Sequence, residues 1–299
     1  MGRVRVSAAG QLIAAGLTPA AVFAATHMRA DADLWGQLPF GLDTLQTWSL
    51  PADDPYSFTQ DTPWINHEWL SELQMGLAWT AGGTAGLALL KGSLTFAAFL
   101  LIWTALRQVH PGARLAILAV VVFGTVHMWS SLRPQLWTFV SVAVLCRILA
   151  GGSAKARRWL PVLFAVWTNN HGGWIVGIGV LAVWAAAKVI VEREPFREWA
   201  MVTLLSILAT LVTPYGWTLW EFVLRTVRLE RAIAEWQPLW AAHPINWVPW
   251  LLAVAAGVWA VFRMPAHRFA AVTVLAMLAC ASLQVQRLES IFVTAAAIL

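Results

Sequence analysis

Residues 84–106 read TAGLALLKGSLTFAAFLLIWTAL and carry one charged side chain, Lys91. A helix of about 20 predominantly apolar residues is long enough to cross the hydrocarbon core of a bilayer. This stretch therefore predicts a membrane-spanning helix, and the rest of the chain has to be compatible with it.

The composition of the whole chain indicates the same class of protein. Of its 299 residues, 59% are hydrophobic and 12% are charged, whereas soluble domains carry roughly 25% charged residues. We predict an all-α fold, a polytopic transmembrane helical bundle in which residues 1–299 form a single domain. About nine or ten spans are expected from the apolar runs 7–26, 84–106, 115–129, 136–149, 159–168, 174–191, 199–212, 247–262, 269–283 and 290–299.

The net charge of +5 is spread along the chain. Charges dispersed between apolar runs are typical of loops that orient a membrane protein, and they argue against a nucleic-acid partner. Residues 1–30 fit a signal anchor better than a cleaved signal peptide, because many apolar segments follow. A cytoplasmic N-terminus places most Lys and Arg residues inside, in the segments 3–5, 107–114, 151–158, 192–198 and 263–268.

This topology predicts two long outer loops, 27–83 and 213–247. We expect short interfacial helices in the first, with 67–81 as an interfacial or half-inserted helix that breaks at Gly82-Gly83. The polar clusters that are not simply basic all fall on the outer side: DADLW (31–35), DDPYSFT (53–59), PWINHEWL (63–70), SLRPQLW (131–137), TNNHGGW (168–174), TPYGW (213–217), EWQP (235–238) and QVQR (284–287). Because polar groups at membrane depth usually face a cavity or a partner, this convergence predicts a site at the outer surface. Ordinary loop polarity is the alternative for any single cluster.

Five of these motifs, in the order DxDLW, DDPYSFT, PWxNHEWL, LRPQ and NNHGG, resemble a bacterial branch of the GT-C superfamily of integral-membrane glycosyltransferases. That superfamily includes the protein mannosyltransferase and aminoarabinose transferase types. The resemblance spans residues 30 to about 290. It implies a polyprenyl-phosphate sugar donor, a saccharide, lipid or protein acceptor, and a site on the periplasmic face of a multi-pass protein of the bacterial inner membrane.

The chain departs from the superfamily pattern in two ways. His67-Glu68-Trp69-Leu70 stands where the superfamily more often has a His-Pro-Pro-Leu type of turn. Members are also commonly longer, and this chain ends in RLESIFVTAAAIL, within an apolar run. We therefore expect a fragment or a shortened relative.

Asp31 and Asp33 form the acidic pair that follows the first apolar segment. Two carboxylates in a loop can converge, either to supply a general base for an acceptor hydroxyl or to bind a divalent cation such as Mg²⁺ or Mn²⁺. The resemblance implies that one of the two is the catalytic base, and we expect Asp33 to be that residue. A helix cap or a solvated loop acid is the structural alternative for either residue.

His67 and Glu68 are expected to bind substrate. A zinc-binding HExxH motif would need histidine at position 71, which is Ser71, so a metalloprotease is disfavoured. The pair can instead hydrogen-bond a sugar or a phosphate, or simply mark the start of a helix, with Asn66 as its N-cap.

The remaining candidates for substrate binding lie at outer helix ends. Arg133 and Arg287 can bind a phosphate, although anchoring to lipid headgroups is an equal alternative. Gln135 belongs to the same LRPQ motif as Arg133. The run Asn169-Asn170-His171-Gly172-Gly173 combines hydrogen-bonding side chains with glycines that permit close approach of a ligand.

The sequence therefore predicts a membrane glycosyltransferase that deprotonates an acceptor hydroxyl while arginines stabilise the departing lipid phosphate. The alternative is a non-catalytic carrier or flippase for lipid-linked saccharides. A flippase would line a path across the whole membrane with polar residues, whereas here, apart from Lys91, they gather on one side.

Overall fold

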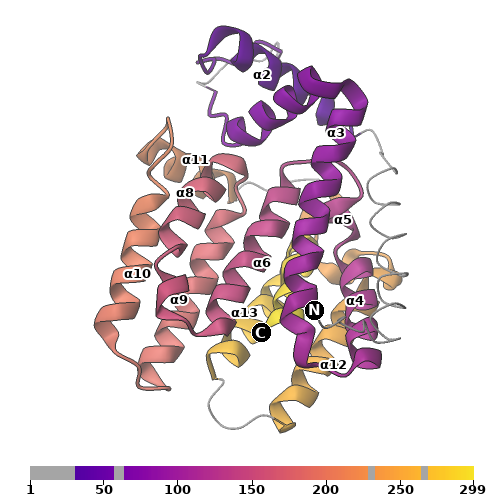
Figure 1. Cartoon of the computed structure of the whole chain (residues 1–299), viewed down its shortest axis with the longest axis vertical. Helices are drawn as coiled ribbons and strands as arrows, with labels where there is room; N and C mark the ends of the chain where they lie inside the picture. Colours follow the sequence, from indigo (N-terminus) through magenta and orange to yellow (C-terminus); the bar gives the residue numbers. More distant parts are fainter. Residues whose placement is uncertain (1–30, 57–63, 228–232, 264–268) are drawn as a thin grey trace, which may run out of the picture.

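The structure is a computed structural model that describes residues 31–56, 64–227, 233–263 and 269–299 (Figure 1). Within these ranges the chain forms α-helices and short 3-10 helices without a strand, so the all-α class is confirmed. The predicted span 7–26 lies outside the described residues. The elements are α2 (Leu34–Thr47), α3 (Trp69–Ala105), η1 (Leu106–Gln108), α4 (Pro111–Gly124), α5 (Val126–Trp129), α6 (Gln135–Gly151), α7 (Ala154–Arg157), α8 (Leu160–Asn170), α9 (Trp174–Ile190), α10 (Phe196–Ala209), α11 (Trp217–Val227), η2 (Ala234–Trp236), η3 (Leu239–Ala241), η4 (Pro244–Asn246), α12 (Trp247–Arg263), α13 (Phe269–Gln284), η5 (Gln286–Leu288) and α14 (Glu289–Ile298).

Two described helical segments are long and apolar enough to cross a membrane, Trp69–Gln108 and Pro244–Phe262. Four further apolar helices are shorter than a full span, namely α4, α6, α9 and α13. The structure thus supports an apolar, all-helical chain, while the larger number of spans stays a prediction.

Helix α6 is the most central of the described elements. It packs against α3, α8 and α14, and most of its residues from Gln135 to Leu149 are buried. Helix α13 lies against α9 and α14, and α12 lies against α14 and α4. The predicted run 290–299 forms α14, which is almost wholly buried, because the surrounding helices enclose it.

Large apolar side chains are exposed around this bundle. Phe262 is 83% exposed, Phe123 is 73% exposed and Leu89 is 71% exposed. Leaving this much apolar surface in water would be costly, since each buried side chain of this size gains about 1.5–3 kcal/mol. A large number of exposed apolar side chains is compatible with a surface that contacts a membrane or a partner.

The glycine pair in the first outer loop interrupts the helix as predicted. Gly82 and Gly83 have non-helical backbone angles inside α3, and Gly83 has φ 55°, where a side chain would be strained. The part of α3 before the pair, Trp69–Ala81, is thereby separated in direction from the apolar part after it. Helix α2 packs against α3, so the segment 27–83 carries short helices as expected, while its outer position stays a prediction.

The predicted apolar run 115–129 is not one helix. It divides into α4 and α5 at Thr125, whose φ of −113° and ψ of 10° lie outside the helical range. Its side chain donates to the carbonyl of Val121, a local bond of the kind that competes with the helical ladder.

The two ends of the bundle carry different elements. In Figure 1, α2, the beginning of α3 and α11 lie at the upper end, whereas the connection between α9 and α10 lies at the lower end. The predicted polar motifs DADLW, PWINHEWL and TPYGW belong to or adjoin these upper elements.

Candidate functional site

Arg133, in the turn before α6, contacts three carboxylates from distant parts of the chain. Its Nη2 lies 2.6 Å from Asp33 Oδ2, its Nε lies 3.4 Å from Asp31 Oδ2 and its Nη1 lies 3.1 Å from Glu235 Oε1. The Arg133 side chain is 20% exposed. The motifs DADLW, SLRPQLW and EWQP therefore meet at one guanidinium.

These partners stabilise the positive charge of Arg133. Burial alone would lower the pKa of its guanidinium, but the carboxylates of Glu235, Asp31 and Asp33 outweigh burial and raise the pKa. A guanidinium presents a planar fork of donors, which suits several oxygen acceptors at once. The same fork suits a phosphate group.

The acidic pair is built by a local turn. Asp31 Oδ1 accepts the backbone N–H of Asp33 at 3.1 Å, and Asp31 Oδ2 accepts the hydroxyl of Ser131 at 3.2 Å. Asp33 precedes α2, but its side chain makes no capping hydrogen bond there. The structure therefore gives no support to the capping alternative for Asp33, and it aims both carboxylates at Arg133.

The predicted divalent cation would have to displace that guanidinium. Arg133 contacts the Asp31 and Asp33 carboxylates together, and in the described ranges no group of three or more His, Cys, Asp or Glu residues is arranged around a metal position. The acidic pair fits the arginine, and we derive no step through a metal.

A second cluster surrounds the Glu68 carboxyl. Its Oε1 lies 3.5 Å from His67 Nε2 and 3.6 Å from His171 Nε2. Arg287 Nη2 lies 3.1 Å from the same His171 nitrogen. The motifs PWINHEWL, TNNHGGW and QVQR therefore converge as well.

Both ring nitrogens of His171 have partners: Nε2 lies near Arg287 and Glu68, and Nδ1 has two further contacts. Thr138 Oγ1 lies 2.7 Å from its Nδ1, and the indole of Trp167 donates to that same hydroxyl at 2.8 Å. The backbone N–H of Gly173 also lies 3.1 Å from Nδ1, and a side chain at position 173 would come within 2.4 Å of Thr138 Oγ1. Glycine at 173 is thus required by the close packing around His171.

Burial and charge shift the pKa values of Glu68 and His171. Burial, followed by electrostatic interactions with Arg287, His67 and Arg133, lowers the pKa of His171 well below its usual value. Burial raises the pKa of Glu68; His67 and Arg287 oppose that rise, Asp33 adds to it and Arg133 opposes it. Asp33 and Arg133, which belong to the first cluster, both affect the pKa of Glu68. The two clusters therefore form one electrostatic site.

Such a site can hold an anionic group and move a proton. Two guanidinium groups supply fixed positive charge. Enclosed side chains with shifted pKa values, histidines most often and carboxyls next, are common among the general acids and bases of enzymes. His67 is partly accessible, with a side chain 31% exposed that packs against the ring of Phe222.

Asn169 and Asn170 are engaged within the protein. Asn169 accepts from the Trp69 indole at 2.8 Å and donates to the carbonyls of Ala165 and Val212. Asn170 accepts from Gln74 at 2.7 Å and donates to the Val166 carbonyl. These bonds tie α8 to α3 beside His171, while direct contact of either amide with a substrate stays a prediction.

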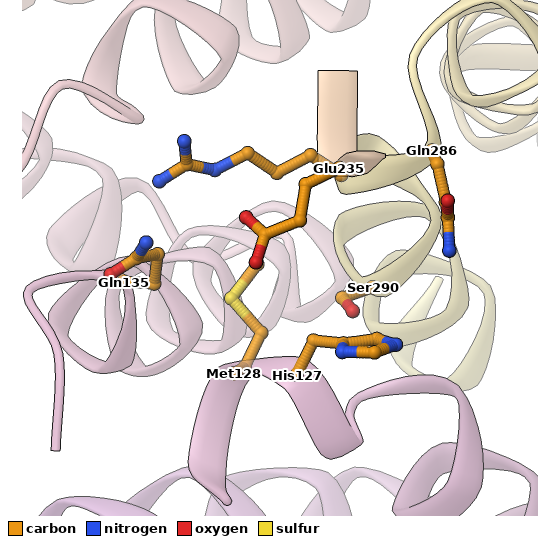
Figure 2. Close-up of a pocket in the computed structure, with 7 residues that line it drawn as sticks. His127, Met128, Gln135, Glu235, Gln286 and Ser290 are labelled. Carbon is orange, nitrogen blue, oxygen red and sulfur yellow. The ribbon is translucent and has the colours of Figure 1, made fainter. Parts of the chain in front are cut away.

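Gln135 begins α6 and lines a pocket with His127, Met128, Glu235, Gln286, Arg287 and Ser290 (Figure 2). Eight of the ten residues proposed from the sequence for catalysis or substrate binding therefore belong to the Arg133 contacts, the Glu68 cluster or this pocket. Asn169 and Asn170 bond to α3, α8 and Val212 instead. Lys91, predicted to lie within a span, donates to the Ser130 carbonyl at 2.8 Å, so it too reaches towards the segment that holds Arg133.

Sequence reasoning missed three contributors. Glu235 was visible only as part of the EWQP motif, and nothing in the sequence pairs it with Arg133. Thr138 and Ser131 resemble ordinary polar residues near a helix start, and their roles depend on contacts with His171 and Asp31. No protein-family model, curated protein or solved structure matches this chain.

Proposed function

We propose that this protein is a membrane glycosyltransferase that moves a sugar from a polyprenyl-phosphate donor to an acceptor at the periplasmic face of a bacterial inner membrane. The proposal is supported by the resemblance of its motifs to the GT-C superfamily and by the convergence of those motifs in space. One observation carries most of it: Arg133 gathers Asp31, Asp33 and Glu235 beside the Glu68–His171–Arg287 cluster.

A membrane setting is supported by the apolar exterior of the bundle. The two long apolar segments, Trp69–Gln108 and Pro244–Phe262, bury only 28% and 11% of their most apolar stretches within the protein. A lipid donor reaches a site most readily when the site opens beside the hydrocarbon region. DADLW leads into α2, PWINHEWL into α3 and TPYGW into α11, the upper elements of Figure 1, and we expect the phosphate of the lipid donor at that end.

The proposed reaction is a displacement at the anomeric carbon of the donor sugar. The acceptor oxygen forms a bond to that carbon, and the bond from the carbon to the phosphate oxygen breaks. The proton of the acceptor hydroxyl passes to Asp33, and the electron pair of the broken bond stays with the polyprenyl phosphate.

The chain's residues contribute to this step in distinct ways. Arg287 and Arg133 stabilise negative charge on the departing phosphate, because fixed donors act most strongly where charge develops. Asp31 orients Arg133 and accepts a hydrogen bond from the Ser131 hydroxyl. Asp33 is more accessible than Asp31, with side chains 53% and 20% exposed respectively, which suits Asp33 to meet an incoming acceptor.

The test uses membranes that contain the full-length protein and a polyprenyl-phosphate donor with a radiolabelled sugar. We expect loss of label from the donor and its appearance in an acceptor, together with release of bare polyprenyl phosphate. The double variant Asp31→Asn/Asp33→Asn should abolish this transfer.

Asp53→Asn is the matched control, because Asp53 is an exposed acid of the same outer loop. It should transfer at the wild-type rate. Absence of transfer from mannosyl, glucosyl and aminoarabinosyl donors, together with absence of donor binding by the purified protein, would overturn the proposal.

A further inference from the structure

His171 lies within the Glu68 cluster and has polar atoms close to each of its ring nitrogens. A neutral imidazole carries one proton, so one ring nitrogen donates a hydrogen bond and the other accepts one. Burial, and after it Arg287, lower the pKa of His171, so the ring is neutral at neutral pH. The groups that face the two nitrogens then decide which of them holds the proton.

The groups that face Nδ1 of His171 are hydrogen-bond donors. The backbone N–H of Gly173 lies 3.1 Å from Nδ1, and a backbone N–H can only donate. Thr138 Oγ1 lies 2.7 Å from the same nitrogen and accepts the indole N–H of Trp167 at 2.8 Å. Because that indole occupies a lone pair of the oxygen, the hydroxyl proton of Thr138 can point at Nδ1. Nδ1 is therefore the acceptor nitrogen, and the ring proton resides on Nε2.

The opposite tautomer fits these contacts poorly. A proton on Nδ1 would face the N–H of Gly173, which sets two donors against each other. The Thr138 hydroxyl would then accept from both Trp167 and His171, and no further hydrogen bond of that hydroxyl occurs among the described residues. Its own proton would lack an acceptor, which is destabilising for a buried group.

The proton on Nε2 lies on the side of the Glu68 carboxyl. Glu68 Oε1 lies 3.6 Å from Nε2, and Arg287 Nη2, another donor, lies 3.1 Å from Nε2. Two donor nitrogens at this separation can share one oxygen acceptor. Arg287 does not depend on Nε2 as an acceptor, since its guanidinium has five N–H groups and lies over the ring of Trp236 at 5.6 Å. His171 and Arg287 therefore form a pair of adjacent donors, one neutral and one charged.

We propose that Thr138 is a positioning residue that holds His171 as the Nε2–H tautomer, so that His171 acts as a neutral hydrogen-bond donor beside Arg287. The tautomer follows from the contacts alone, whereas its use in sugar transfer rests on the proposed function. In that reaction the Nε2–H donates to an oxygen on which negative charge develops. The ring keeps its proton throughout, and the proton of the acceptor hydroxyl still passes to Asp33.

The first test determines the tautomer directly, by nitrogen NMR of the full-length protein labelled with ¹⁵N-histidine. Comparison with His171→Gln assigns the two resonances of His171. At neutral pH we expect Nδ1 to resonate as an unprotonated nitrogen and Nε2 as a protonated one. Thr138→Val should raise the ratio of Nδ1–H to Nε2–H by about 3- to 10-fold, the usual net value of one hydrogen bond. Thr138→Ser keeps the hydroxyl and should restore the wild-type ratio.

Thr168→Val is the matched control for Thr138→Val. Thr168 is a buried threonine of α8, and its Oγ1 has no hydrogen-bond partner among the described residues. The control should leave the tautomer ratio unchanged. A wild-type His171 that carries its proton on Nδ1, or protons on both nitrogens, would overturn the tautomer. A ratio in Thr138→Val equal to that of the wild type would overturn the role of Thr138.

The second test examines how the Nε2–H is used, in the assay of radiolabelled sugar transfer. A glutamine side chain can place an amide N–H near the position of Nε2, whereas leucine offers no donor. His171→Gln should keep kcat within about 10-fold of the wild type, and His171→Leu should lose about 10²- to 10³-fold, the typical cost of removing one donor to a developing negative charge. Equal losses in the two variants would overturn the donor role. A wild-type protein that has the expected tautomer but transfers no sugar would overturn the proposed function and leave the tautomer standing.

Discussion

Arg133 Nη2 lies 2.6 Å from Asp33 Oδ2, although the two residues are 100 positions apart in the chain. The same guanidinium contacts Asp31 and Glu235. A residue with three acidic partners from the segments 27–83 and 213–247 joins those segments to the start of α6. Arg133 is therefore both a structural link and, in our account, a ligand of the donor phosphate.

Arg133→Gln should destabilise the protein because three carboxylates would lose their common cation. Because the site is partly exposed, the free energy of unfolding should fall by about 1–2 kcal/mol. Breaking a fully buried ion pair would cost about 3–5 kcal/mol. The midpoint of thermal unfolding in detergent measures it. Arg133→Gln/Glu235→Gln should recover part of the loss, since one uncompensated charge is removed. An unchanged midpoint in the single variant would show that the cluster does not hold the loops together.

Glu68 should make the protein less stable as pH rises. Its pKa is raised in the folded state, so folding favours the protonated carboxyl. That contribution is complete below the unfolded pKa of 4.5 and is lost as pH rises through the folded pKa. Glu68→Gln should therefore flatten the fall in unfolding midpoint above pH 4.5. If the unfolding midpoints of Glu68→Gln and the wild type fell in parallel above pH 4.5, burial of the Glu68 carboxyl would not explain the pH dependence.

His171 should make the protein less stable as pH falls, the opposite of the effect of Glu68. Its pKa is lowered well below 6.5 by burial and by nearby positive charges, so folding favours the neutral ring. Stability is then lost as pH falls from about 6.5 towards the folded pKa, because the unfolded chain takes up a proton that the folded protein excludes. His171→Gln should show a smaller loss of midpoint below pH 6.5. An unfolding midpoint of His171→Gln that changes with pH as the wild-type midpoint does would contradict this account of His171.

A separate ion-pair network lies near the connection between α9 and α10. Glu192 contacts Lys188 at 2.6 Å and accepts the backbone N–H of Ala270, in the first turn of α13, at 3.1 Å. Glu192→Ala should cost about 1 kcal/mol, the typical value of a lost helix cap. Glu198→Ala removes a partner of Arg157 whose side chain is 57% exposed, and it should cost less than about 0.5 kcal/mol. Equal losses in the two variants would argue against a capping role for Glu192.

The predicted orientation is tested by labelling single cysteines in intact cells, in a protein whose native Cys146 and Cys280 are replaced by Ser. Ser153→Cys and Arg193→Cys should be shielded from a membrane-impermeant thiol reagent, because basic connections are expected on the cytoplasmic side. Asp53→Cys should be labelled. Labelling at position 153 would contradict both the topology and a periplasmic site.

The local features of this fold could be predicted from the sequence because short-range physics decides them. The composition predicts helices with an apolar exterior, and Gly82-Gly83 predicts the break in α3. The division at Thr125 could not be predicted, because it depends on one φ/ψ choice and one side-chain bond inside an apolar run. The burial of α14 likewise depends on the packing of neighbouring helices, which periodicity does not reveal.

The candidate site was predictable as a set of motifs but not as a network. Alternating the apolar runs across a membrane places the polar motifs on one side. The pairing of Glu235 with Arg133 joins residues 102 positions apart, and no local pattern encodes such a contact. Nor does the NNHGG motif itself show that Asn169 and Asn170 bind α3 while His171 faces Glu68.

The central claim is that the acidic pair beside Arg133 performs the chemistry of sugar transfer. Asp33→Asn keeps the size of the side chain but removes most of its capacity to accept a proton. The most direct measurement is the rate of transfer from the preferred polyprenyl-phosphate donor by purified full-length protein, made together with donor binding. The account predicts a loss of about 10²- to 10⁴-fold in kcat with a donor Kd that is unchanged or lower, because one negative charge near the phosphate is removed. Transfer by Asp33→Asn and Asp31→Asn at near wild-type rates would contradict it and place the chemistry elsewhere.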